Sequence, residues 1–131
     1  MIDKSNEIFN IVATDLRSAY SGIKVVGEYV YTPTVFPTVT IDEVQNLPVH
    51  LDSAGLPKYA EVVYRVQVFC NDIGKRAKAR EIYGTVFERL SSLGLVSVTY
   101  STTPAIYNSE VYSITGTFRG VLDRNGVIYR G

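Results

Sequence analysis

Residues 59–71 constrain the fold of this chain more than any other part of the sequence. Their side chains alternate between two sets, as in a β-strand whose successive side chains point to opposite faces of a sheet. Because one set is apolar, we expect that face to lie in the core, and the face with Glu61, Arg65 and Gln67 to be exposed. The expected core set is Ala60, Val62, Tyr64, Val66, Val68 and Cys70.

Two amphipathic helices are predicted on either side of this region. Apolar residues recur at spacings of three and four over 8–19 and again over 79–93, where Gly94 is a typical C-terminal stop. The expected N-terminal caps are Asp3 or Ser5 for the first helix and Asn71 or Asp72 for the second.

The remaining segments predict strands and loops. Strands are expected at 23–26, 38–44, 95–101, 110–123 and 127–130. Two stretches with prolines, 29–37 and 45–58, are expected to be an exposed loop or edge and a long functional or mobile connection. The order helix, strands, helix, strands with hairpin-like connections predicts an α+β fold, in which both helices pack on one face of a mostly antiparallel sheet.

Length and composition limit the class of protein. The 131 residues suit a single domain, and 13 basic against 13 acidic side chains argue against binding nucleic acid or membranes by bulk charge. One cysteine excludes an intrachain disulfide, and neither an export signal nor a membrane-spanning run is visible. We therefore expect a chain that works in a reducing cytoplasm and does not act at a membrane.

No catalytic arrangement stands out in the sequence. His50, Asp52 and Ser53 have the residue types of a nucleophilic triad, but neighbours on one loop seldom reach the required geometry, so we interpret them as a polar loop. Asp42 and Glu43 are adjacent in a predicted strand and should point to opposite faces. Cys70 is expected to be buried, and Gly116 and Gly120 to mark a bulge or close backbone approach. We expect no enzyme activity, no metal and no cofactor.

Two groups of residues are candidates for partner contacts. Four basic residues crowd the first turns of the second helix, where they oppose the helix dipole. We interpret these residues first as a solvated face of the helix, second as a contact for an acidic protein partner, and third as a contact for DNA. Aromatic residues in proline-containing segments form the second group, since Tyr is enriched at protein interfaces. The candidate interface residues are Tyr29, Tyr31, Phe36, His50, Asp52, Lys75, Arg76, Arg80 and Tyr107, with Lys78 completing the basic cluster.

Three stretches of sequence carry a resemblance to a known family. They are FPTVTI at 36–41, VYRVQVFCN at 63–71 with its helix up to Gly94, and VYSI through FRGVLD to IYR over 111–130. Together they resemble the tail terminator proteins, also called tail completion or head-tail joining proteins, of long-tailed bacteriophages. None of these stretches is a catalytic signature.

The resemblance implies a structural subunit of the virion, assembled in the host cytoplasm. Such a subunit forms a homo-hexameric ring at the head-proximal end of the tail tube, ends tube growth and meets the head connector or stopper. DNA would pass through the lumen without specific binding. The alternatives are another neck or tail ring, such as a connector component or the tube protein, and a small cytoplasmic enzyme or ligand-binding domain with a pocket lined by Tyr64, Tyr83 and Tyr112. A nucleic-acid-binding module is a further alternative.

Overall fold

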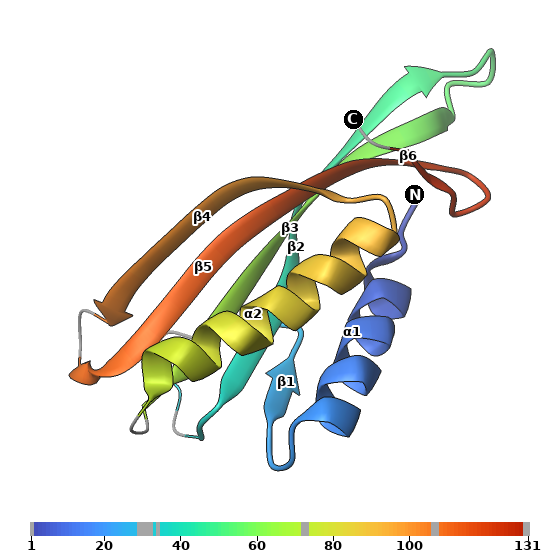
Figure 1. Ribbon diagram of the computed structural model, residues 1–131. Helices are drawn as coiled ribbons and strands as arrows, with labels where there is room; N and C mark the ends of the chain where they lie inside the picture. The colour runs from blue at the N-terminus through green and yellow to red at the C-terminus, as the bar shows by residue number, and fades with distance from the viewer. Residues whose placement is uncertain (1, 29–32, 34, 72–73, 106–107, 130–131) are drawn as a thin grey trace.

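The protein is described by a computed structural model that covers residues 2–28, 33, 35–71, 74–105 and 108–129, with the side chains of 103–110 left aside. Two helices pack on one face of a six-stranded sheet of order β1-β2-β3-β5-β4, in which β6 also pairs with β5 (Figure 1). Only β1 and β2 run parallel, so the predicted α+β fold is confirmed. The elements are α1 (Ser5–Ala19), β1 (Lys24–Val26), β2 (Thr38–Leu51), β3 (Pro57–Cys70), α2 (Lys75–Ser92), β4 (Val96–Ala105), β5 (Asn108–Asp123) and β6 (Ile128–Tyr129).

The start of α1 is fixed by Asp3, although Lys4 occupies the N-cap position. The Asp3 carboxylate accepts hydrogen bonds from the backbone N–H of Ser5 at 2.9 Å and from its hydroxyl at 2.6 Å. Those bonds satisfy a donor at the helix end, and they hold the pKa of Asp3 below its ordinary value. The predicted apolar stripe is confirmed at Ile8, Val12 and Leu16, which are buried, but not at Ala19, which is exposed.

The start of α2 differs from the prediction. The N-cap is Gly74, in the left-handed conformation with a φ of 79°, and no side chain caps the helix. Asn71 is therefore not the cap, and Asp72 lies outside the described residues. The helix ends as expected before Gly94, whose φ of 103° suits glycine. Its buried stripe is Ala79, Ile82, Tyr83, Val86 and Leu90.

The predicted long connection at 45–58 is wrong, because these residues belong to a hairpin. β2 runs on to Leu51 and pairs with β3 as far as Pro57, so the turn is only 52–56. Pro48 misled the sequence interpretation. β1 pairs with β2 only over Thr38–Thr40, so the rest of β2 is an edge strand among the described residues, and edge strands tolerate proline.

β5 is the central strand of the second half of the sheet, between β3 and β4. Its two glycines face the helices and let other groups approach closely. A Cβ on Gly116 would lie 2.9 Å from Cζ of Tyr83, and one on Gly120 would lie 2.7 Å from Cδ2 of Leu95. The predicted close backbone approach is confirmed at both positions. The Gly116 gap allows Tyr83 of α2 to pack directly on the sheet.

Candidate interaction surfaces

The β2–β3 hairpin projects beyond the helical layer, and residues 45–59 of it are called the arm below (Figure 1). Large apolar side chains are exposed on it: 47% of Leu47, 60% of Leu51 and 59% of Leu56. Val127 and Tyr129, at the neighbouring β5–β6 turn, are exposed to a similar degree. Sequence analysis missed this cluster because the arm was interpreted as a loop.

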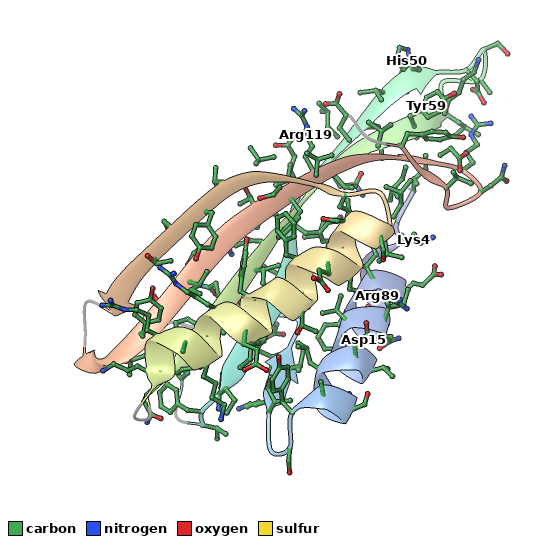
Figure 2. The ribbon with its side chains drawn as sticks, viewed as in Figure 1. Lys4, Asp15, His50, Tyr59, Arg89 and Arg119 are labelled. Carbon is green, nitrogen blue, oxygen red and sulfur yellow. The ribbon has the colours of Figure 1, made fainter. Side chains whose placement is uncertain are left out.

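His50 and Asp52 both lie at the end of the arm, but they have separate partners. The His50 ring meets the ring of Tyr59 edge to face, with centroids 5.7 Å apart (Figure 2). The Asp52 carboxylate accepts hydrogen bonds from the guanidinium of Arg124 and from the N–H of Leu56, which lower its pKa. Asp52 therefore shapes the turn, as the polar-loop interpretation predicted, whereas His50 is a residue of β2 and not of a loop.

The base of the arm is tied to the N-terminal segment. The Lys4 ammonium donates to the carbonyl of Gly126 at 2.6 Å, and the Asn46 side chain donates to the carbonyl of Ile2 at 2.8 Å. These contacts join residues that are far apart in the sequence. They fix the direction of the arm relative to α1 and the β5–β6 turn.

The basic cluster lies at the start of α2, where the first turn has no acidic residue. Arg76 and Arg80 are exposed, whereas Lys75 and Lys78 are partly buried. The Arg76 guanidinium lies 5.7 Å from the centroid of the Tyr112 ring, within range of a cation–π interaction. Since Tyr112 belongs to β5, this contact places the basic cluster at the end of the sheet where β3 ends and β5 begins.

An acidic groove of about 680 Å³ lies where β1 ends beside β2. We call it the β2 groove; its lining residues include Phe9 and Ile41 and three acidic residues, Glu28, Asp42 and Glu43. Sequence analysis missed it, because its lining residues come from separate segments of the chain that only the fold brings together.

Asp42 and Glu43 point to opposite faces of the sheet, as predicted. Asp42 forms an ion pair with Arg65 at 2.8 Å on the face away from the helices. Glu43 accepts a hydrogen bond from the Tyr64 hydroxyl at 2.8 Å on the helix face. Burial, together with this carboxylate, raises the pKa of Tyr64.

The sheet face away from the helices is less exposed than predicted. Gln67 is buried, and its side-chain oxygen accepts a hydrogen bond from the Thr40 hydroxyl at 2.9 Å. Arg65 is partly buried in its ion pair, and Glu61 is also partly buried. The neighbouring β4 and β5 present hydroxyl groups here, including the pair Thr99 and Thr117 at 2.8 Å.

Several predicted residues are not surface residues or fall outside the described part. Tyr29, Tyr31 and Tyr107 lie outside it. Phe36 is half-buried and Pro37 is buried. The expectation that 29–37 is an exposed loop or edge is therefore wrong for these two residues.

The buried predictions include Cys70, which is 2% exposed, as the strand alternation indicates. The ligand-pocket alternative required three tyrosines around one cavity, and the structure does not group them. Tyr64 lines the β2 groove, whereas Tyr83 of α2 and Tyr112 of β5 are buried. Among the residues that the structure describes, no cluster of three potential metal ligands occurs. Neither described helix has the length and apolar character that a membrane crossing requires.

Comparisons with known proteins found a likeness in structure but none in sequence. No protein-family model matches the sequence, and no curated protein matches it. Among solved structures, the chain is similar to one described as "Structure of bacteriophage SPP1 gp17 protein", with 16% identity and a TM-score of 0.38 over 86% of this chain and 89% of that one. At that TM-score the likeness carries no argument about function, so the function has to be argued from the residues of this chain.

Proposed function

We propose that this chain is a structural protein of a long-tailed bacteriophage virion: a tail terminator that forms a ring at the head-proximal end of the tail tube. The ring, hexameric in this proposal, ends tube growth and offers a docking surface to the head connector or stopper. The proposal rests on the three stretches at 36–41, 63–94 and 111–130 that resemble that family. It assigns the chain no chemistry.

The arm is the observation that carries the proposal. Its leucines Leu47, Leu51 and Leu56 lie on a hairpin that extends beyond the helices, where a soluble monomer gains nothing from apolar exposure. Exposed apolar groups gathered on one projection are typical of surfaces that bind other proteins. A terminator needs such a projection, because it has to contact the tube or the connector outside its own ring.

The two edges of the sheet also suit a ring. A closed ring requires two different, complementary surfaces on each subunit, since its contacts are head to tail. β4 forms one edge of the described sheet, and β1 with the free part of β2 forms the other, so the presence of two different edges supports the proposal.

Electron microscopy of particles that carry a gold-labelled, tagged chain tests the proposal. One label at the head-tail junction is the expected result. Label along the whole tail would make the chain a tube protein, and particles without label would refute a virion role.

Substitutions on the arm give a second test. Leu51→Ser with Leu56→Ser should leave the purified protein folded, because both side chains are largely exposed, but should remove the label from the junction. Val35→Ser is the matched control, since Val35 is 44% exposed and lies before β2, at the opposite end from the arm. Equal labelling with both variants would contradict the role of the arm.

A further inference from the structure

The outer edge of β4 is unusually open to pairing. Among the described residues, β4 pairs only with β5, so its other side carries backbone groups without a strand partner. Residues 96–105 contain no charged side chain, and Val98 and Tyr100 are 54% and 51% exposed. Charged residues are one usual protection of an edge strand against pairing with another chain, and β4 has none; its other interruptions are Pro104 and the bulge at Val98.

The opposite edge of the sheet has a free stretch of similar length. β1 covers β2 only at Thr38–Thr40, so from Gln45 to Leu51 no described strand lies on the outer side. This stretch also contains no Asp, Glu, Lys or Arg. β4 runs antiparallel to β2 within one subunit, because each of the three intervening pairings is antiparallel. A second copy placed beside the first would therefore meet β2 with its β4 in antiparallel orientation.

The pairing register sets the offset between the two copies. Within one subunit, Thr103 lies level with Thr38, through Ser113 and Phe69. The free stretch begins at Gln45, seven residues further along β2, and one of those is the bulge residue Val44. A shift of six strand positions, about 20 Å at roughly 3.3 Å per residue, therefore brings β4 onto the free stretch. Because the shift is an even number of positions, the two faces of the sheet continue from one copy to the next. Ser101 of one copy then lies opposite Leu47 of the other, and Val96 lies opposite Leu51.

The same shift aligns the charges of the two copies. Tyr112, under the Arg76 guanidinium, lies one position below the level of Thr103. After the shift of six positions, Tyr112 of one copy lies level with Glu43 of the next copy. Both residues are on the helix-bearing face of the sheet, and Glu43 lines the β2 groove. One displacement thus pairs β4 of one copy with the free stretch of β2 in the next copy. It also brings the basic cluster of the first copy level with the β2 groove of the second.

We propose that a second copy of this chain docks head to tail: β4 of one copy pairs with 45–51 of the next, and the basic start of α2 lies over the Glu28 and Glu43 carboxylates. This joint names the self-contact of the proposed ring and rests on that proposal. Pro48 provides no N–H and the bulges at Val44 and Val98 interrupt both edges, so pairing by backbone alone is weak. The charges then select this register over pairing with unrelated strands.

A cysteine pair tests the joint. Ser101→Cys with Leu47→Cys places two exposed thiols opposite each other across it, whereas Cys70, 2% exposed, stays protected. The control pair is Ser101→Cys with Leu51→Cys, which the register separates by four residues. Under mild oxidation, we expect the first pair to give a ladder of disulfide-linked copies in denaturing gels and the control pair to give monomers.

Charge reversal provides the second measurement. Arg80→Glu should reduce the ladder several-fold, and Glu28→Lys in the same chain should restore it, because every copy contributes both surfaces. Arg17→Glu makes the same charge change at an exposed position of α1 and should have no effect.

The outcomes separate the joint from the proposed function. Particles that contain the protein without the Ser101–Leu47 ladder would overturn the joint and leave the function standing. A ladder from purified protein that no particle contains would support the joint and refute the function. Equal ladders from both cysteine pairs would overturn the register.

Discussion

Replacement of Gly116 by alanine should destabilise the protein through one identifiable contact. The new methyl group would overlap the Tyr83 hydroxyl and lie 2.9 Å from Cζ of that ring and 3.0 Å from the carbonyl oxygen of Thr99. Neither the ring nor the backbone moves freely, because Tyr83 is buried between α2 and the sheet. Overpacking of this kind costs about 1–3 kcal/mol. For a domain of this size that corresponds to a fall in Tm of about 3–5 °C per kcal/mol.

The hydroxyl of Tyr83 makes the test specific. It is buried without a hydrogen bond to any described residue, since Ser97 lies near it but outside hydrogen-bond geometry. Burial, with a smaller contribution from Tyr100, raises the pKa of Tyr83 to about 12. Tyr83→Phe should therefore cost little by itself, and it should lower the cost of Gly116→Ala by removing the nearest overlapping atom.

Urea unfolding followed by circular dichroism gives the four free energies of this double-mutant cycle. Gly84→Ala is the matched control, because its Cβ would meet nothing within 4 Å. It should raise the free energy of unfolding by about 0.5–1 kcal/mol, as expected for Gly→Ala inside a helix. If Gly116→Ala cost the same with Tyr83 and with Phe, or cost nothing, the close-approach argument would be refuted.

Two further predictions concern titration. Because burial and Glu43 raise the native pKa of Tyr64 above the unfolded value of about 10, the folded state keeps a proton that the unfolded chain loses, so stability should fall above about pH 10. Tyr64→Phe should flatten that fall in urea titrations, and an unchanged slope would contradict the argument. Arg124→Gln should raise the pKa of Asp52 toward its ordinary value, while the N–H of Leu56 keeps part of the lowering. Carbon NMR of the Asp52 carboxyl measures this shift, and an unmoved pKa would exclude Arg124 as the main cause.

The elements with a clear period were predictable from the sequence, and the elements with breakers were not. The apolar face of the alternation in 59–71 and the stripe of α2 are confirmed, and the stripe of α1 is confirmed except at Ala19. Pro48 favours a connection over a strand in the interpretation of 45–58, but a proline fits a strand whose outer side has no neighbour. Which strand is an edge depends on how far β1 extends, and that is a property of the whole sheet.

The candidate surfaces were less predictable for the same reason. His50 and Asp52 are neighbours in the sequence and both lie near the end of the arm, but only Asp52 is in the turn, because β2 continues through His50 to Leu51. The β2 groove joins residues from α1, β1 and β2, and only the fold brings Glu28 beside Glu43. Gln67 looked like an exposed polar residue from its parity, but Thr40 on the adjacent strand supplies a buried partner for it. Parity predicts the face of a residue but not what covers that face.

The position of β5 between β3 and β4 sets a condition on folding during synthesis. β3 and β4 are both made before β5, yet neither has its inner partner until β5 has left the ribosome, so the nascent chain exposes the inner edge of β3 and both edges of β4 at once. Such edges are the species on which aggregation begins. A chain truncated before Asn108 would lack the strand that joins the two halves of the sheet. Its yield in soluble form should therefore depend on chaperones more than that of the full chain.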